Sequence, residues 1–342
     1  MQTEKFPVIS VLVAARNEAA NIGDCLDALL NQDYPKDKFE IWVGDDLSED
    51  KTSAIVQSYA TQHTNIHLLS IETQLKHQRC KSNVLAQLAH KAEGEFFFIT
   101  DADTTVVPEW LSSMMGYFSP ETGVITGVTA IKGKSLFAQL QNAEWLFYTA
   151  QGHFYAQKGK PVTAMGNNMA VKASVYWQTG GYENIPFSVT EDYELFRQIM
   201  QRGFQFRTVL EPHGLAFTHP LPTFGALIKQ RRRWFTGALQ LPKPFVAGLL
   251  FLWASLPVAI LIGFLISWRV AGVLVLLKWL LDLGMLFKTY RDIDLKTDAG
   301  VWLYTPFSLV ANTIFLFLQF IPGPVEWKGR KYEETYLTGD VE

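Results

Sequence analysis

The sequence has little of what marks several classes of protein. It holds two cysteines, Cys25 and Cys80, too few for a disulfide framework or a zinc site, so we expect a reduced, cytosolic globular part. Its formal net charge is −3; without a basic excess to neutralise phosphates, we do not expect it to bind nucleic acid. The first residues, MQTEKFPVIS, contain neither a basic nor an apolar stretch, which predicts no signal peptide.

Glycine-rich phosphate loops are also missing. The first apolar run is followed by AARNEA, which matches neither G-x-G-x-x-G nor a Walker A sequence. This argues against a classical dinucleotide site or P-loop.

The first hundred residues alternate apolar runs with amphipathic segments, a pattern typical of a parallel, doubly wound α/β sheet. Strands are predicted at 8–15, 39–45, 65–70 and 95–101, and helices at 20–30, 52–59 and 81–90. Further helices are predicted at 111–118, 135–156 and 191–203, with a short strand at 167–171. Ligands of such sheets bind at the carboxyl ends of the strands.

Three apolar segments follow, at 245–266, 270–287 and 303–321, each long enough to cross a bilayer. Lys278 and Asp282 in the second segment are four residues apart, so they share a helix face and can pair. Pro306 and Asn312 leave open whether the third segment spans or is re-entrant, and hence on which side the C-terminus lies.

Carboxylates stand where two of the predicted strands end. Asp101 and Asp103, in TDAD, follow the fourth strand, and Asp46 with its neighbour Asp45 follows the second. Such oxygens suit Mg²⁺ or Mn²⁺ and the ribose of a nucleotide, although polar turns explain each motif alone. Glu191–Asp192 at a helix start is either a capping charge or a general base.

Taken in order, the motifs resemble those of the family-2 glycosyltransferases with the GT-A fold, which include cellulose, hyaluronan and ceramide-glucose synthases. The motifs are the Asp pair, Asp-x-Asp, Glu-Asp and, as the most specific, QRRRW at 230–234. The resemblance covers residues 6–240. It implies an α/β GT-A fold with a doubly wound mixed sheet, followed by a C-terminal transmembrane helical region.

The resemblance also assigns roles. By the resemblance, the residues that bind the nucleotide-sugar are Ala15, Arg16, Glu18, Asp46, Lys81, Asp101 and Asp103. Asp101 and Asp103 are also the expected ligands of Mg²⁺ or Mn²⁺. The resemblance makes Asp192 the catalytic base, with Glu191 beside it. It places Gln230, Arg233 and Trp234 in the motif that closes over the diphosphate and the acceptor end. A looser match assigns the acceptor Gly166, Asn167 and Asn168. Arg231 and Arg232 are expected to serve mainly the membrane surface.

The implied function is inverting, metal-dependent transfer of one sugar from a nucleotide-sugar, by family expectation a UDP-sugar, to a membrane lipid. Asp192 would take the proton of the acceptor hydroxyl, while the cation and Arg233 would stabilise the leaving diphosphate. A single base and direct displacement predict inversion. The terminus WKGRKY (327–332) is similar to that of ceramide glucosyltransferase-like and bacterial lipid enzymes, or else is a basic membrane flank.

Two alternatives stay open. One is a subunit of a processive polysaccharide synthase, although three apolar segments are too few for one chain to enclose a polymer tunnel. The other is an inactive sugar-nucleotide-binding membrane protein. The predicted organisation is a cytosolic catalytic domain (1–222), an amphipathic interfacial helix region (223–244), a transmembrane region (245–325) and a tail (326–342), in a multi-pass protein of the inner cell membrane. The oligomeric state stays open.

Overall fold

The computed structural model describes residues 6–75, 78–241, 243–319, 325–327 and 330–332, and the chain divides into two compact units. The first comprises Met1–Thr129 and Thr163–Thr218, and the second Ala130–Val162 and His219–Glu342. In this division residues 130–162 belong with the C-terminal apolar helices, while the catalytic domain over 1–222 stays a prediction.

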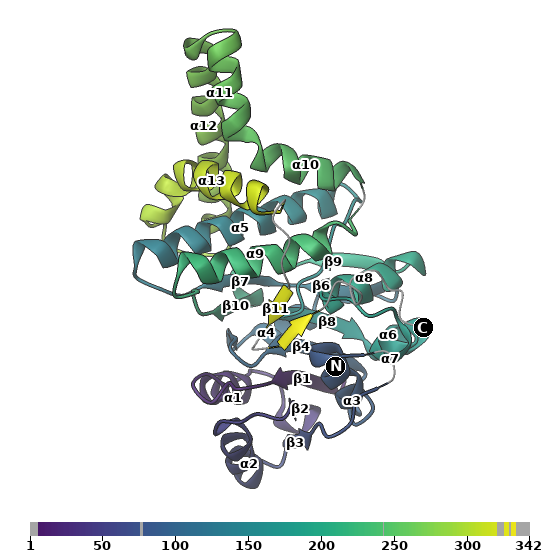
Figure 1. Cartoon of the computed structure of the whole chain (residues 1–342). Helices are drawn as coiled ribbons and strands as arrows, with labels where there is room; N and C mark the ends of the chain where they lie inside the picture. Colours follow the sequence, from purple (N-terminus) through teal and green to yellow (C-terminus); the bar gives the residue numbers. More distant parts are fainter. Residues whose placement is uncertain (1–5, 76–77, 242, 320–324, 328–329, 333–342) are drawn as a thin grey trace. The chain divides into compact units, whose positions relative to one another are not determined.

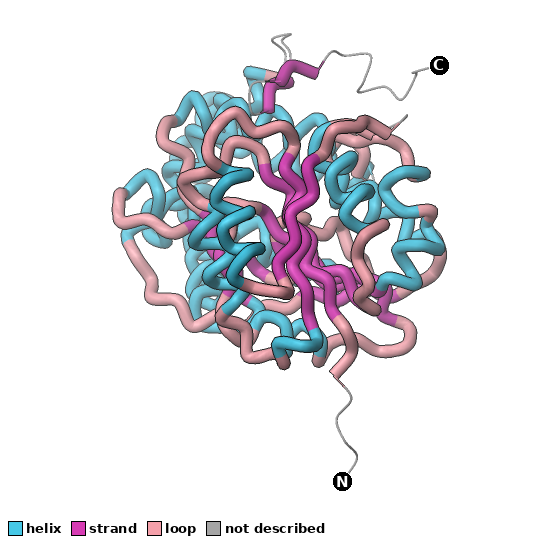
Figure 2. The backbone as a smooth tube through the Cα atoms, turned by 90° about the horizontal axis from the view of Figure 1, so that it is seen from below, coloured by secondary structure: helices cyan, strands magenta, loops and turns pink. Residues whose placement is uncertain are grey.

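The first unit contains a seven-stranded sheet with the order β3-β2-β1-β4-β8-β6-β9. Its strands are β1 (Ile9–Ala15), β2 (Phe39–Asp45), β3 (Ile66–Ser70), β4 (Phe96–Asp101), β6 (Thr122–Thr126), β8 (Asn168–Lys172) and β9 (Gln205–Thr208). The first four are parallel, β8 is antiparallel to both β4 and β6, and β9 is parallel to β6. The predicted mixed α/β sheet is therefore confirmed. Figure 2 shows helices on both sides of the strands.

Burial on both faces explains why β1 is a continuous apolar run. Ile41 and Val43 of β2 belong to the core formed with α1 (Ile22–Leu30) and α2 (Thr52–Gln62), whereas Gly44 faces the other side of the sheet. A Cβ on Gly44 would lie 2.3 Å from Val84 on α3, so only glycine permits this helix to approach so closely. Figure 1 accordingly shows α1 and α2 on one side of β1–β3 and α3 on the other.

Shorter elements complete the first unit. Its α-helices are α1 (Ile22–Leu30), α2 (Thr52–Gln62), α3 (Cys80–Ala89), α4 (Trp110–Met115), α6 (Ala173–Thr179), α7 (Gly181–Asn184) and α8 (Glu191–Gln201). Its 3₁₀ turns are η1 (Lys36–Lys38) and η2 (Pro212–Gly214). A small sheet has the order β5-β10-β7, formed by β5 (Thr105–Val106), β10 (Leu215–Thr218) and β7 (Val128–Ile131), of which Val128 and Thr129 belong to this unit.

In the part that the structure describes, the second unit consists mainly of helices, with one short pair of antiparallel strands. It contains α5 (Leu136–Gln157), α9 (Phe224–Ala238), α10 (Lys243–Trp253), α11 (Ser255–Leu265), α12 (Trp268–Asp292), α13 (Ala299–Leu318), β11 (Val325–Trp327) and β12 (Arg330–Tyr332). α5 packs on α12 through a hydrogen bond from Asn142 Nδ2 to the Tyr290 hydroxyl, 2.9 Å, and on α13 through the rings of Phe147 and Tyr304. These contacts place α5 in this unit.

Two helices among the described residues, α12 and α13, are long and apolar enough to cross a membrane. The first predicted segment is not one straight span: α10 and α11 are bent by 61°. Pro257, in the first turn of α11, has no N–H for the carbonyl of Trp253, which weakens the helix at this bend. If the bent pair is counted as one span, the structure has up to three.

The third predicted segment is not interrupted at proline. α13 continues through Pro306, which leaves the carbonyl of Trp302 without its usual donor in the same helix. The indole N–H of Trp279 on α12 donates to that carbonyl at 3.1 Å, so the backbone group is satisfied by the neighbouring helix. The predicted pair of Lys278 with Asp282 is confirmed, with 2.6 Å between Nζ and Oδ2.

Some predictions at the C-terminal end concern residues outside the described part. These are the end of the third segment (320–321), PGP at 322–324, Lys328 and Gly329 of WKGRKY, and the tail from 333 to 342.

Candidate active site

The ends of β1 and β2 bring together three of the residues assigned to the nucleotide-sugar. The N–H of Asp46 donates to the Ala15 carbonyl at 2.9 Å. Arg16 donates to the carbonyls of Asp46 and Leu47, the second at 3.1 Å. Asn17 and Leu47 both have positive φ, 53° and 55°, so each strand turns sharply where it ends.

Glu18 lies at the same edge of the sheet and is 5% exposed. Its N–H donates to Thr52 Oγ1 on α2 at 2.7 Å, and its carboxylate accepts from Asn21 Nδ2 at 2.7 Å. Beside it, Asp45 holds one buried carboxylate oxygen that has no hydrogen-bond partner among the described residues. The site assignment from sequence took Asp46 and left Asp45 out. Buried polar atoms ordinarily have a hydrogen-bond partner, so this Asp45 oxygen is an exception.

A charge cluster forms around Lys81, which lies in the first turn of α3. Its ammonium is 2.6 Å from Asp101 Oδ1 and 3.1 Å from Glu191 Oε1, and it donates to the Gly166 carbonyl at 3.4 Å. Burial favours the neutral form of Lys81, but the negative charges of Asp101, Glu191 and Asp192 outweigh it and raise the Lys81 pKa. Lys81 therefore joins the carboxyl end of β4 to the start of α8.

Asp192 is held differently from its neighbour Glu191. Its Oδ2 accepts from the Gly166 N–H and its Oδ1 from the Tyr193 N–H, both at 2.8 Å. Burial, and then repulsion by Glu191, raise the pKa of Asp192 to about 6, against the opposing effects of Lys81 and the two N–H groups. This carboxylate is thus poised to exchange a proton near neutral pH.

Gly166 touches both parts of this cluster. A Cβ at this position would lie 2.9 Å from Asp192 Cβ and 3.2 Å from Lys81 Nζ. Glycine is therefore needed here for the backbone to reach the Asp192 carboxylate, and a larger residue would have to displace it.

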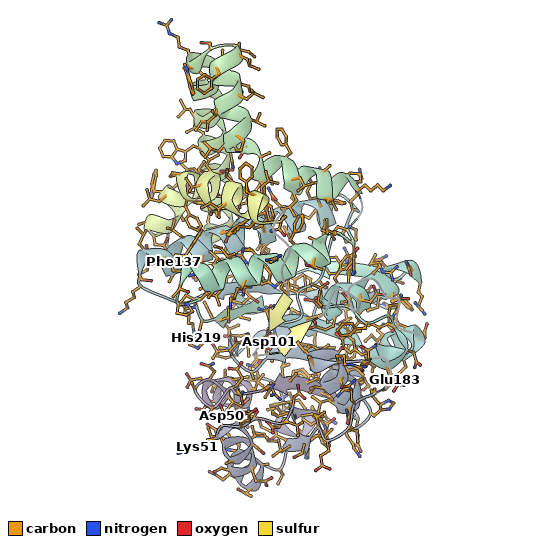
Figure 3. The ribbon with its side chains drawn as sticks, in the orientation of Figure 1. Asp50, Lys51, Asp101, Phe137, Glu183 and His219 are labelled. Atoms are coloured by element: carbon orange, nitrogen blue, oxygen red, sulfur yellow. The ribbon has the colours of Figure 1, made fainter. Side chains whose placement is uncertain are left out.

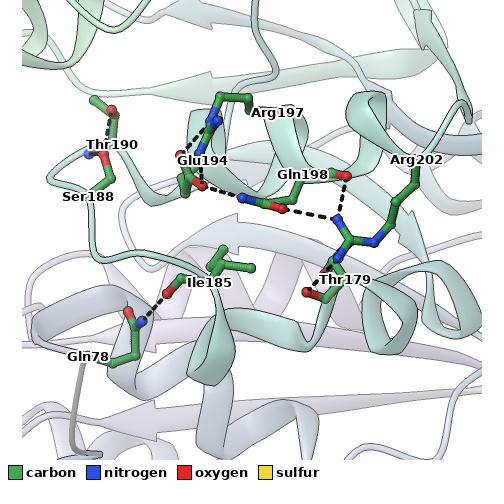
Figure 4. A network of polar contacts seen from close by, with 9 residues as sticks. All are labelled: Gln78, Thr179, Ile185, Ser188, Thr190, Glu194, Arg197, Gln198 and Arg202. Carbon is green, nitrogen blue, oxygen red and sulfur yellow. Dashed lines mark hydrogen bonds and ion pairs between the residues drawn. The ribbon is translucent and has the colours of Figure 1, made fainter. Parts of the chain in front are cut away.

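A network of polar contacts runs along the helix that carries Glu191 and Asp192 (Figure 4). Buried Glu194 accepts from Arg197 Nε and Nη2, at 2.9 and 2.7 Å, and from Gln198 Nε2 at 2.8 Å. Gln78, just before α3, donates to the Ile185 carbonyl at 2.9 Å. This bond links the segment that leads to Lys81 with the loop that leads to α8.

Asp101 ends β4 (Figure 3), and Asp103 follows two residues later. Burial, and next the charges of Asp103 and Asp101, raise the pKa of the Cys25 thiol, which places both carboxylates near one buried group. Among the described residues no group of three or more His, Cys, Asp or Glu could hold a metal ion. Two carboxylates fit a Mg²⁺ or Mn²⁺ that takes further oxygens from water and substrate phosphates.

The GNN segment serves the fold as well as the site. Asn168 is fully buried; its Oδ1 accepts from Trp110 Nε1 at 2.8 Å, and its Nδ2 donates to the carbonyls of Val128 and Gly214. Because both amide hydrogens are donated within the fold and the side chain is fully buried, Asn168 is not available to bind an acceptor. Asn167 accepts from Thr129 through Oδ1, at 3.1 Å.

The QRRRW motif lies on α9 in the second unit. Arg231 is buried and pairs with Glu144 of α5, which corrects its expected position at the membrane surface. Gln230 accepts from Arg231 Nη1 at 2.9 Å, and the ring of Trp234 lies 4.8 Å from that of Trp145. Glu144 and Trp145 stand in no motif, so the sequence offered no signal for either.

Comparison with known proteins identifies the family. The profile of the family described as "Glycosyltransferase like family 2" matches residues 7–237, and the chain belongs to this family.

Three relatives represent its range. The probable glycosyltransferase YdaM of Bacillus subtilis is 28% identical over 255 residues, covering 71% of this chain and 58% of that protein. The beta-monoglucosyldiacylglycerol synthase of Synechocystis is 27% identical over 246 residues, covering 70% and 49%. The poly-beta-1,6-N-acetyl-D-glucosamine synthase of Staphylococcus epidermidis is 27% identical over 240 residues, covering 67% and 54%. The chain spans about half the length of these curated relatives.

A solved structure agrees with the fold. The mannosyltransferase PcManGT from Pyrobaculum calidifontis, in complex with GDP-Man and Mn²⁺, superposes with a TM-score of 0.55 at 18% identity, covering 93% of this chain and 89% of that one. This likeness supports the α/β GT-A architecture.

Proposed function

We propose that the chain transfers a single sugar, with inversion, from a nucleotide-sugar to a membrane lipid at the cytosolic face, with a divalent cation. The observation that carries the proposal is Asp192, a carboxylate with a pKa near 6 beside the cluster of Lys81, Asp101 and Glu191. Asp192 accepts the proton of the acceptor hydroxyl as its oxygen attacks the anomeric carbon. Glu191, already paired with Lys81, is the weaker candidate for this role.

The donor's nucleotide is proposed to bind where β1 and β2 end. Ala15, Arg16, Glu18 and Asp46 lie there, and the unpaired oxygen of Asp45 offers an acceptor for a hydroxyl or an N–H of the nucleotide. A UDP-sugar is the proposed donor, on the family's precedent, and Lys81 is proposed to reach it as well.

Asp101 and Asp103 are proposed to hold Mg²⁺ or Mn²⁺ together with the diphosphate. When bound, the cation would neutralise charge on the leaving diphosphate. The complex of PcManGT with GDP-Man and Mn²⁺ is a precedent within the same architecture. Gln230, Arg233 and Trp234 are proposed to serve the diphosphate and the acceptor end, on the family resemblance alone.

A lipid acceptor is supported by two observations. α12 and α13 are apolar enough to cross a membrane, and one relative is named beta-monoglucosyldiacylglycerol synthase. Gly166 and Asn167 of the GNN segment are proposed to lie near the acceptor. Asn168 is proposed to serve the fold alone. The inner cell membrane, with the first unit in the cytosol, is the proposed location.

The test is mass spectrometry of membrane lipids from cells that express the chain or its Asp192→Asn variant. We expect a glycolipid, one sugar heavier than its precursor, that appears only with the unchanged chain. Donor screening against that precursor then identifies the nucleotide-sugar, and EDTA should abolish transfer. Turnover by Asp192→Asn equal to that of the unchanged chain would refute the mechanism.

The second candidate is a polymer synthase, favoured by the similarity to poly-beta-1,6-N-acetyl-D-glucosamine synthase. Product length separates the two, because a processive enzyme yields chains of many sugars. Nucleotide-sugar binding without turnover over a broad acceptor panel would instead support an inactive binding protein.

A further inference from the structure

A buried ion pair joins α9 to α5 in the second unit. Arg231 Nη2 lies 2.5 Å from Glu144 Oε2, and the two side chains are 7% and 1% exposed. Burying two charges costs several kcal/mol per ion, and apolar side chains of similar size are often as stable in their place. Stability alone is therefore a weak explanation for this pair, which suggests that its geometry matters.

The same guanidinium contacts two residues of the QRRRW motif. Arg231 Nη1 donates to Gln230 Oε1 at 2.9 Å, and its Cζ lies 4.5 Å from the ring centre of Trp234. The Trp234 ring in turn lies 4.8 Å from that of Trp145, the residue after Glu144. Arg231 thus ties α5 to the side-chain positions of Gln230 and Trp234.

The ion pair also holds one face of α9 against α5. Leu227, Arg231 and Trp234 are spaced as i, i+4 and i+7, so they share a face, and Leu227 packs in a cluster with Trp253 and Phe315. Arg233 follows Arg231 by two residues and projects about 200° away around the helix axis. A rotation of α9 would displace Arg233 and Gln230 together.

We propose that Glu144 and Arg231 are positioning residues for the QRRRW motif: their ion pair fixes the rotation of α9 and the orientation of Gln230 and Trp234. The proposal rests on the proposed function, because it assumes that the motif serves the transfer reaction. Lysine cannot replace Arg231, since a single ammonium cannot pair with Glu144, donate to Gln230 and stack on Trp234 at once.

The test compares Glu144→Gln, Arg231→Gln and their double variant in the full-length protein, by thermal unfolding and by initial rates at varied donor and acceptor. Each single variant leaves a buried charge without its partner, so its Tm falls. The double variant regains much of that Tm, but its kcat stays about 10- to 100-fold below that of the unchanged chain, because the motif is misplaced. Recovery of kcat together with Tm in the double variant would show a merely structural pair.

A second ion pair of the same unit supplies the matched control. Lys278 and Asp282 on α12 lie 2.6 Å apart, and the Asp282 side chain is 7% exposed. Breaking it with Asp282→Asn should lower Tm while kcat changes by less than about threefold. A fall in kcat equal to that of Glu144→Gln would overturn the proposal, because any loss of stability in this unit would then suffice.

Failure of the proposed function is recognised separately. If the unchanged chain transfers no sugar, that function is wrong, and hydrogen exchange tests the pair instead. Amides of α9 should exchange faster in Glu144→Gln than in Asp282→Asn. Equal exchange of α9 in the two variants would show that the ion pair does not hold this helix.

Discussion

Two neighbouring carboxylates at the start of α8 have different chemistry because their contacts differ. Glu191 faces the ammonium of Lys81 at 3.1 Å, whereas Asp192 receives backbone N–H groups and has a raised pKa. The sequence places both at a helix start but does not show which one Lys81 neutralises. Only the folded structure shows that Lys81 contacts Glu191.

The first prediction concerns pH. Asp192 must be ionised to accept a proton, and its pKa is raised to about 6, so kcat should rise with pH through about 6 and level off above it. At lower pH the carboxyl is protonated and the base is lost. Initial rates from about pH 5 to 8 at saturating substrates measure this.

Asp192→Asn should remove the activity at every pH. The exposed Glu121 offers a control, since Glu121→Gln should leave the profile unchanged. A flat profile across this range would show that Asp192 does not act as the base.

The second prediction concerns Gly166. In Gly166→Ala the new methyl group would lie 2.9 Å from Asp192 Cβ and 3.1 Å from its Oδ2, so the carboxylate or the loop must move. We expect a loss of about 1–3 kcal/mol in the free energy of unfolding, as for other overpacked sites, and a large fall in kcat. Gly23→Ala is the control, because its Cβ would meet only the Tyr59 hydroxyl, at 3.7 Å. Equal kcat for the two variants would contradict the close contact.

At the scale of helices, α12 and α13 are linked through the Trp302 carbonyl, which lacks a donor within α13 because residue 306 is proline. Trp279→Phe should destabilise the protein by about 1–2 kcal/mol, because the Trp302 carbonyl loses its donor. Pro306→Ala restores an N–H in α13, so the same Trp279→Phe change should cost less in that background. Thermal unfolding of the four proteins measures the coupling, and additive losses would show that the two groups do not share the carbonyl.

Apolar periodicity predicted most elements of the first unit, because β1 and β4 are largely buried on both faces and the helices repeat at helical spacing. It did not reveal the bend at Ala254, since α10 and α11 are apolar apart from Lys243 and Ser255, and only Pro257 marks the change. Nor could it place α5, whose partner Tyr290 is 148 residues away in sequence.

Motif order named several residues that lie together in the structure, but it did not predict all of their contacts. Asp101, Glu191 and Lys81 do converge, because the end of β4 and the first turns of α3 and α8 lie together. The Asn168 side chain, by contrast, forms its hydrogen bonds within the fold. Arg231 is buried against Glu144, which stands in no motif. Such pairings are set by tertiary packing.

For the whole molecule, the division into units predicts which truncations stay soluble. Ending the chain after Thr218 keeps every strand of the large sheet but leaves α5 without α12 and α13. We expect this variant to aggregate, because the α5 face around Asn142 and Phe147 becomes exposed.

Replacing residues 130–162 in that truncation by a flexible Gly/Ser linker should restore a monodisperse protein with the far-UV spectrum of a mixed α/β fold. Size-exclusion chromatography without detergent compares the two variants. Equal solubility would show that α5 does not depend on the C-terminal helices.

The interleaving of the two units sets an order for biogenesis. On the ribosome, α5 emerges before β8 and β9, and long before α12 and α13, with which it packs. The nascent chain therefore carries α5 without its helical partners while the sheet is still incomplete. Translation therefore has to reach α13 before α5 can complete its packing, so this part of the second unit folds late.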